Sequence, residues 1–471
     1  MPAEAVLEEC IMSSSQTLDK QPLFTNKKLI ALLIPIYFEQ LLGIVVGMVD
    51  GIMVSSVGEA AISAVSLVGN ISAVMVNLFA ALASGGCIVT SQLLGANKRT
   101  DARRSAGQVV TLSVIVSGAI MLVCLLLNRQ LLELFFGHID EDVMQASITY
   151  FAYNALSFPF LAVCSAGGAI LRANGNSRVS FYVSLLRNAV NIAGNAICIY
   201  GLGMGVEGVA IPTALCRIVG AVTVMLVVMD KKQTLRPDWK DIFSVSPRLM
   251  GRMTRVGLPT ALESSMFQLG RVFTLSMISG FGTYQIAANS TAGALTNFAV
   301  IATTTTRIAS LTVIGQCVGA HDMEQIKVNF RKLMIISYIS HAVFAILTVI
   351  FRFPLIHLYK KLEPETVELA AQLLCIHLIP AIFLYPLSFF TSGPLRAAND
   401  SAFPMWVSIL SMAIFRLTLA QILCVNLGWG AVGVWWAMIV DWCCRSVCFT
   451  VRWYRGKWKK KCGLDTLEVT Q

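Results

Sequence analysis

A carboxylate lies inside an apolar stretch near the start of the chain. Asp50 is the one charged residue of GIVVGMVDGIMVSS, residues 43–56. An ionised carboxylate within an apolar membrane helix costs about 2.5–3.5 kcal/mol on insertion scales, so Asp50 is expected to face a cavity, carry a proton or hold a cation. Glu39 precedes Asp50 by eleven residues, or three helical turns, which places both carboxylates on one helix face.

A polar stripe on a later segment supplies complementary ligands. Ser184, Asn188, Asn191 and Asn195 recur at helical spacing, and Thr213 follows on the next apolar segment. The oxygen atoms of Asp, Asn and Thr are hard ligands that suit Na⁺, and a desolvated Asp suits H⁺ equally well, so the residue types leave both ions open. A stripe of Asn can also serve only to hold membrane helices together.

The elements that must position these residues are predicted to be membrane helices. Of the 471 residues, 56% are hydrophobic and only 13% are charged, with a mean hydropathy of +0.71. Twelve apolar segments are long enough to cross a hydrocarbon layer of about 30 Å, and they lack the period-two alternation of a transmembrane barrel. They lie at residues 29–56, 60–90, 107–128, 145–171, 179–202, 206–230, 253–281, 284–316, 332–352, 367–392, 402–425 and 430–452. An all-α polytopic membrane protein follows.

The net charge of +10 is distributed as a membrane protein requires, so no nucleic-acid partner is expected. Basic residues cluster at alternate connections, whereas the connection GHIDEDV at 137–143 is acidic. Both termini are therefore predicted to be cytoplasmic, although Arg352, Lys360 and Lys361 depart from the rule. The basic positions are Lys27, Lys28, Lys98, Arg99, Arg103, Arg104, Arg172, Arg178, the 232–252 linker and the C-terminal WYRGKWKKK.

The chain contains an internal repeat with an offset of 224 residues. SQLLGA (91–96) returns as GQCVGA (315–320), and LRANGNS (171–177) returns as LRAANDS (395–401). Pro35 matches Pro259 and Glu39 matches Glu263. Each copy holds six spans, so two parallel lobes related by a pseudo-two-fold axis are expected to enclose a cavity, the geometry of a secondary transporter.

This organisation predicts five segments and a lobe-to-lobe motion that exposes the cavity to alternate sides. A monomer in the plasma membrane is expected. The segments are a cytoplasmic tail (1–27), an N-lobe (28–231), a cytoplasmic linker (232–252), a C-lobe (253–452) and a basic cytoplasmic tail (453–471).

The two lobes differ in their polar residues. Thr274 stands at the position that matches Asp50, so the Asp-centred site is expected once. The second half adds Arg271, Arg307 and Arg416 within its spans. Each of these arginines is expected either to pair with a carboxylate such as Glu263, to reach an interface, or to meet an anionic part of a substrate. The residues expected to line the cavity are Glu39, Asn70, Asn77, Asn188, Gln268, Arg271 and Arg416.

The sequence resembles the multidrug and toxin compound extrusion (MATE) transporters of the MOP flippase superfamily from about residue 25 to 452. The resemblance depends on VDGIMVSSVGEAAISAVSL, SQLLGAN, NIAGNAICIYGLGMGVEGVAIPTA, GLPTALESSMFQLG and GQCVGAHDMEQ. It implies a first-lobe cation site at Asp50, Asn191, Asn195 and Thr213, and a coupling role for Glu263. Some members carry a second Asp where this chain has Asn195.

If the resemblance holds, the protein exports organic molecules in exchange for Na⁺ or H⁺ and needs no other cofactor. The alternative is a flippase of the same superfamily for a lipid-linked pyrophosphate precursor, held by the second-lobe arginines. An enzyme is not expected, because the five histidines form no HExxH or similar motif and no nucleophile set is evident.

Overall fold

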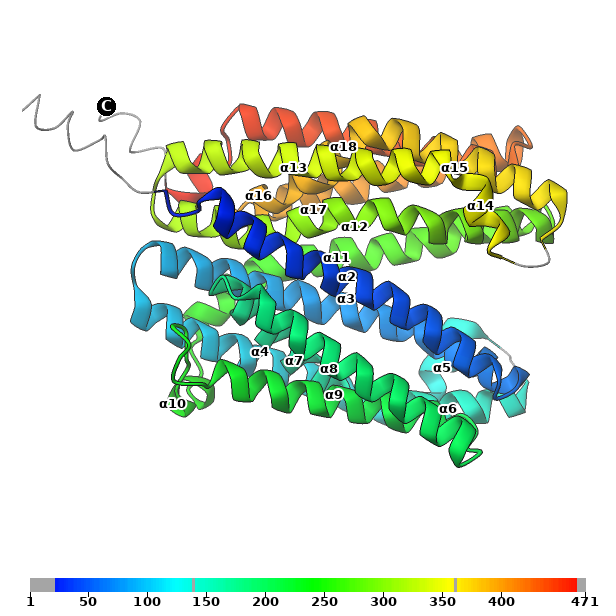
Figure 1. Ribbon diagram of the computed structural model, residues 1–471, viewed down its shortest axis with the longest axis horizontal. Helices are drawn as coiled ribbons and strands as arrows, with labels where there is room; N and C mark the ends of the chain where they lie inside the picture. The colour runs from blue at the N-terminus through cyan, green and yellow to red at the C-terminus, as the bar shows by residue number, and fades with distance from the viewer. Residues whose placement is uncertain (1–21, 138–139, 360–361, 464–471) are drawn as a thin grey trace, which may run out of the picture.

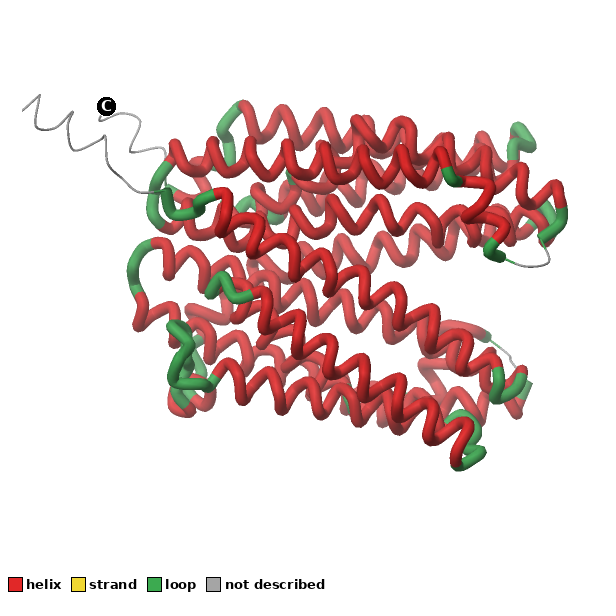
Figure 2. Tube along the Cα trace, viewed as in Figure 1, coloured by secondary structure: helices red, strands yellow, loops and turns green. Residues whose placement is uncertain are grey.

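The computed structural model describes residues 22–137, 140–359 and 362–463. Helices make up nearly all of these residues, and no strand occurs among them (Figure 2). Helices satisfy all their backbone hydrogen bonds within one segment, as an apolar environment demands. The predicted all-α fold is confirmed.

The N-lobe contains six long spans, of which one is broken. The chain bends by 43° between α6 and α7, where Pro159 at the start of α7 cannot donate a backbone hydrogen bond. The helices are α2 (Asn26–Ser55), α3 (Glu59–Gly95), α4 (Arg99–Leu126), the short α5 (Asn128–Phe136), α6 (Glu141–Leu156), α7 (Phe158–Ala173), α8 (Ser177–Ala196) with the π-helical turn η1 (Ile197–Gly201), and α9 (Glu207–Val228).

The C-lobe repeats this order with more π-helical turns. One such turn begins at Pro386, which lacks the N–H that an α-helix would use. The elements are α11 (Pro247–Ser279), α12 (Thr283–Gly319), α13 (Met323–Ile350), the short α14 (Arg352–His357), α15 (Pro364–Tyr385), η2 (Pro386–Phe390), α16 (Ser392–Ala397), α17 (Ala402–Ser411), η3 (Met412–Thr418), η4 (Gln421–Asn426) and α18 (Gly430–Tyr454).

Twelve spans account for the fold. Nine continuous helical segments of the described residues are long and apolar enough to cross a membrane, and the bent pair α6/α7 makes a tenth. The other two spans are α8 and α11, which have the length of a span but carry the polar residues of the predicted site. The protein is a multi-pass membrane protein.

The two lobes meet at one end of the molecule and diverge toward the other (Figure 1). At the closed end α3 crosses α12, and a side chain at Gly95 would collide with the backbone carbonyl of Gln316. The repeat-related contact also occurs, because a side chain at Gly319 would collide with the carbonyl of Gln92. Glycine is needed at both positions for this approach.

Side-chain hydrogen bonds reinforce the same crossing. The Nε2 atom of Gln92 donates to the carbonyl of Ala397 at 2.8 Å, and that of Gln316 donates to the carbonyl of Ala173 at 2.9 Å. Both donors and both acceptors are related by the 224-residue offset. The two bonds therefore form a pseudo-symmetric latch between the lobes, called the Gln latch below.

Turns at matching positions of the two lobes share unusual backbone angles. Gly58 and Gly282, each just before the second helix of its lobe, have φ angles of 132° and 100°. Asn97 and His321, each just after that helix, have φ angles of 56° and 53°. Left-handed values are rare for residues other than Gly, so their recurrence at matching positions shows that the two lobes share one backbone plan.

Two segments differ from the predicted boundaries. The helix α11 begins at Pro247, inside the predicted 232–252 linker, and the linker also contains the short helix α10 (Trp239–Phe243). In the predicted C-terminal tail, Trp458 is buried and stacks on Trp453 with ring centroids 4.6 Å apart. Residues 1–21 of the predicted N-terminal tail and residues 464–471 lie outside the described residues.

Candidate functional site

Asp50 is held by the polar stripe of α8. Asn195 Nδ2 donates to Asp50 Oδ1 at 3.0 Å. In the orientation that gives both amide atoms partners, Asn191 Nδ2 donates to the two Asp50 oxygens at 3.0 and 3.1 Å. Within the described chain, no Lys or Arg lies within ion-pair distance of Asp50. Asp50 is thus held by neutral amides and has no cationic partner among the described residues.

The same cluster contains buried polar atoms without partners. Asn195 Oδ1 and Asn188 Nδ2 are buried and unbonded. Buried polar atoms are nearly always hydrogen-bonded, and an unbonded acceptor is one place where a water molecule or an ion can bind. Thr213 Oγ1 donates to Val209 O of its own helix at 2.8 Å, and no hydrogen bond of the described residues joins it directly to Asp50. The residues fit a small cation, with Asp50 and Asn195 best placed to bind it.

Glu39 also faces α8, as its spacing from Asp50 predicts. It accepts a hydrogen bond from Ser180 Oγ at 3.3 Å. Arg172 at the end of α7 lies 3.9 Å away, and both side chains are 20% exposed. Glu39 therefore belongs to a loose, partly open ion pair rather than to the group around Asp50.

Glu263 lies in the other lobe, in a tight network. Arg396 Nη2 contacts its Oε2 at 2.6 Å, and Ser408 Oγ donates to its Oε1 at 2.9 Å. Arg445 Nη2 lies 4.0 Å from the same carboxylate. The structure does not bring Glu263 together with Asp50, so any coupling between the two groups has to act through the lobes.

Pairing with Glu263, one of the three outcomes expected for Arg271, Arg307 and Arg416, does not occur among the described residues. Arg396 occupies that place, because the repeat positions it on α16 as it positions Arg172 against Glu39. Arg416 instead contacts Met438 Sδ at 3.3 Å, and Arg271 and Arg307 form no ion pair with any described residue.

The remaining predicted cavity residues are less organised. Asn70 is exposed on α3, and Asn77 Nδ2 donates to Ala73 O of its own helix at 2.8 Å. Gln268 on α11 is half-buried and forms no hydrogen bond with a described residue. Side chains built at Gly43 and Gly47 would meet nothing within 4 Å, so space surrounds this part of α2.

Sequence reasoning missed two charged groups within the spans, one half-buried and one buried. Arg217 on α9 donates to Ser157 Oγ at 2.6 Å, beside the α6/α7 bend. Arg445 on α18 is 1% exposed and lies 3.9 Å from Asp441, which accepts a hydrogen bond from Ser411 at 2.5 Å. The sequence does contain a signal for both groups, because charged residues stand within the sixth and twelfth apolar segments.

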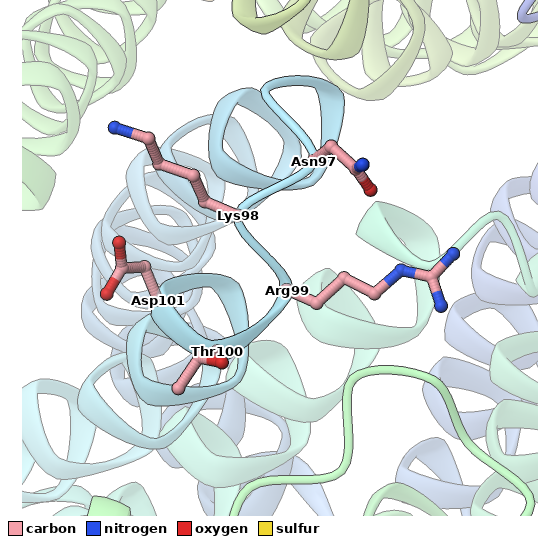
Figure 3. Close-up of a pocket in the computed structure, with 5 residues that line it drawn as sticks. All are labelled: Asn97, Lys98, Arg99, Thr100 and Asp101. Atoms are coloured by element: carbon pink, nitrogen blue, oxygen red, sulfur yellow. The ribbon is translucent and has the colours of Figure 1, made fainter.

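A surface hollow lies at the α3–α4 turn and is separate from these groups. It is lined by residues 97 to 101, and the Lys98 and Arg99 side chains extend in different directions (Figure 3). None of the predicted site residues lines it. It is a feature of the closed, basic end of the molecule.

Two repeated six-span lobes with a membrane-embedded carboxylate define a secondary-transporter architecture. The MatE family model matches residues 35–197 and 259–422, two segments whose first residues are 224 positions apart, like the internal repeat. The chain belongs to the MatE family and is a MATE family transporter.

Its relatives cover nearly the whole chain. The "Uncharacterized transporter YisQ" of Bacillus subtilis (strain 168) is 26% identical over 94% of this chain and 97% of its own length. The "Probable multidrug resistance protein NorM" of Thermotoga maritima is 25% identical over 95% and 96%. A solved structure described as the "Outward-facing conformation of a multidrug resistance MATE family transporter of the MOP superfamily" covers 93% of this chain and 96% of its own, with a TM-score of 0.85 and 20% identity.

Proposed function

We propose that the protein is an antiporter that exports organic molecules from the cytoplasm in exchange for Na⁺ or H⁺. The observation that carries the proposal is Asp50 itself, a membrane-embedded carboxylate with amide partners and no cationic one. A group in this state can gain a cation without first breaking an ion pair. Relatives named as multidrug proteins support soluble organic molecules as cargo over a lipid-linked precursor.

The orientation follows from the closed end. The basic residues of the α3–α4 turn, the α7–α8 turn and the linker lie at the end where α3 and α12 touch (Figure 1). Under the positive-inside rule this end is cytoplasmic. The proposed state is therefore closed to the cytoplasm, with the Gln latch formed, and open to the outside.

The proposed cycle couples ion occupancy to the lobe arrangement. Asp50 on α2 contacts Asn191 and Asn195 on α8, so a cation at Asp50 changes how α2 packs on α8. The first half of α2 also packs against the C-lobe, where Leu32 and Ile36 share a core cluster with Val313 of α12. This helix thus links the ion site to the other lobe, and the coupling equals the difference in ion affinity between the two states.

The decisive experiment is efflux from proteoliposomes under separately imposed Na⁺ and pH gradients. Asp50→Asn keeps the volume of the side chain but removes its charge, so gradient-driven efflux is expected to fall to the level of protein-free vesicles. Asp101→Asn, at an exposed position in the first turn of α4, is the matched control and should retain wild-type efflux. Undiminished gradient-driven efflux by Asp50→Asn would refute the proposal.

A further inference from the structure

The linker between the lobes is fastened to the side of α4. Gln108 Nε2 on α4 donates to the carbonyl of Asp241 at 2.7 Å, and Gln108 Oε1 accepts from the Ser246 N–H at 2.7 Å. Thr111 Oγ1, one turn further along α4, donates to the carbonyl of Ile242. The part of the linker that forms α10 therefore has one fixed position against the N-lobe.

These contacts place α10 beside the membrane-spanning part of α4. The charged first turns of α4, from Arg99 to Arg104, precede Gly107, where the apolar segment begins. A side chain at Gly107 would collide with the backbone of Asp241. Figure 1 shows α10 next to α4 at the closed end of the molecule. Because α10 contacts α4 between Gly107 and Thr111, it lies level with the first turns of the apolar segment and not beyond its charged end.

The backbone of the linker is satisfied as an apolar environment requires. Gln108 is 0% exposed, and its amide bonds to the carbonyls of Asp241 and Ser244 as well as to the N–H of Ser246. Irregular backbone at membrane depth is tolerated only where its polar groups find partners within the protein. A linker in water would not need a buried glutamine for this purpose, because water can bond the same groups.

The short helix α10 has one buried face and one exposed face. Ile242 is buried and shares a core cluster with Val109 and Val110 of α4. Trp239 and Phe243, four residues apart on another face, are 60% and 78% exposed, and their rings stack with centroids 6.1 Å apart. Two adjacent aromatic rings that are held rigidly and left exposed mark an interaction surface.

The charges of the linker indicate the partner of this surface. Both acidic side chains of α10 and its N-cap have partners, since Asp238 contacts Arg103 at 2.5 Å and Asp241 accepts from the Asp238 N–H at 3.0 Å. Aromatic rings flanked by Lys and Arg are typical of segments at the boundary between lipid headgroups and acyl chains. The exposed basic residues of the linker are Lys231, Lys232, Lys240 and Arg248.

We propose that α10 is an in-plane membrane anchor, whose Trp239 and Phe243 side chains insert at the boundary between the headgroups and the acyl chains. The partner of the exposed face is lipid, because α10 lies at the depth where α4 enters its apolar segment. The choice of the cytoplasmic leaflet follows from the orientation in the proposed function. The insertion itself goes beyond that function and does not depend on antiport.

The test is quenching of tryptophan fluorescence in the full-length protein, reconstituted in phosphatidylcholine that carries bromine near the headgroup end of its acyl chains. The emission of Trp239 is the difference between the wild type and Trp239→Phe, a change that keeps an aromatic ring. Bromine at this depth is expected to reduce the difference emission about twofold, and bromine near the chain ends should reduce it less, because interfacial helices insert only about 5–10 Å. Phe243→Trp adds an emitter that should be quenched in the same way.

The matched control is Trp458→Phe. Trp458 is 3% exposed and stacks on Trp453, so the difference emission for this position should be insensitive to brominated lipid. A Trp239 emission that brominated lipid leaves as unquenched as that of Trp458 would overturn the anchor. Quenching of that emission by aqueous iodide would then assign the face to water and to a soluble partner.

The outcome is separate from that of the efflux experiment. Quenching needs no ion gradient, so an unquenched Trp239 leaves the antiport proposal standing. Conversely, undiminished gradient-driven efflux by Asp50→Asn would refute antiport and leave a quenched Trp239 as evidence for the anchor.

Discussion

The two lobes contain the same ion pair in two different states. Glu39–Arg172 in the N-lobe spans 3.9 Å with both side chains 20% exposed, whereas its repeat-related pair Glu263–Arg396 spans 2.6 Å with both 6% exposed. Around these pairs the chemistry diverges: the N-lobe has Asp50 with amide partners, and the C-lobe has Thr274, whose hydroxyl bonds to its own helix. One backbone plan thus supports a lobe suited to a cation and a lobe rich in arginine.

Packing explains why the C-lobe cannot hold a copy of the ion site. Met412 stands at the position of Asn188, and its Sδ atom lies where a side chain at Gly270 would have to go. The thioether of Met412, at the start of η3, thus fills the space beside Gly270 of α11. Duplication of the fold therefore did not duplicate the site.

The largest expected effect comes from opening the buried pair. Arg396→Ala leaves the buried Glu263 with only Ser408 and the more distant Arg445, which should lower the free energy of unfolding by about 3 kcal/mol. Arg172→Ala, its counterpart in the looser pair, should cost no more than about 1 kcal/mol. Unfolding of both variants in mixed micelles measures the difference. Equal destabilisation would show that the two pairs are not energetically distinct.

The second largest effect is expected from adding a methyl group at the closed end of the molecule, compared with the same change on the open side. Gly95→Ala drives a methyl group into the Gln316 carbonyl, and Gly43→Ala meets nothing within 4 Å. We expect Gly95→Ala to destabilise the closed arrangement by about 1–3 kcal/mol and Gly43→Ala to leave it unchanged. Cys87 is buried on α3 beside Thr312, so a membrane-permeant thiol reagent should label it faster when this end of the molecule opens. The labelling is measured on the peptide that contains Cys87. Identical Cys87 labelling in both variants would contradict the proposed closure.

A swap of residues between the lobes tests the ion site. Asn195→Leu installs the residue that the repeat places at 419 and removes one hydrogen bond to Asp50, so the apparent affinity for the coupling ion should fall about tenfold. The reciprocal Leu419→Asn should create no new ion dependence, because Thr274 replaces the carboxylate there. Ion titrations of efflux provide the measurement. An unchanged affinity in Asn195→Leu would remove Asn195 from the site.

The smallest expected effect comes from the Gln latch. Gln92→Ala and Gln316→Ala each remove one bond of the Gln latch, worth about 1 kcal/mol, which should raise the open fraction at this end about fivefold. Gln92→Ala also removes the hydrogen bonds of Gln92 with Asn399 and Arg252. Gln92→Ala should therefore have the larger effect of the two single variants, and the double variant should exceed either. Gln145→Ala, at an exposed position on α6, is the control for the same Cys87 labelling. Unchanged Cys87 labelling in Gln316→Ala, which loses the latch bond alone, would argue against the latch.

Much of the fold and part of the candidate site could be predicted from the sequence. Helical spacing placed Ser184, Asn188, Asn191 and Asn195 on one buried face of α8, as the structure has it. It also placed Glu39 and Asp50 toward a common neighbour. Such predictions succeed because a helix fixes which residues share a face without reference to the rest of the chain.

The sequence failed where a contact joins distant elements. Arg396 pairs with Glu263 across 133 positions, whereas the three candidate arginines within the apolar segments do not pair with it. The mean hydropathy of α8 and α11 is also too low to identify them as membrane spans, because both helices carry polar residues that belong to the site. Both errors arise because polar residues in a membrane are satisfied by tertiary partners, which no local pattern specifies.

By itself, the sequence determined that this chain forms twelve membrane helices in two repeated lobes. The length of each apolar segment and the recurrence of the same residues 224 positions later can both be read without knowing any tertiary contact. The tertiary structure alone decided which carboxylate is neutralised. It buries Glu263 against Arg396 and leaves Asp50 with amides only, because ion pairing depends on distances of a few ångströms between helices far apart in the sequence.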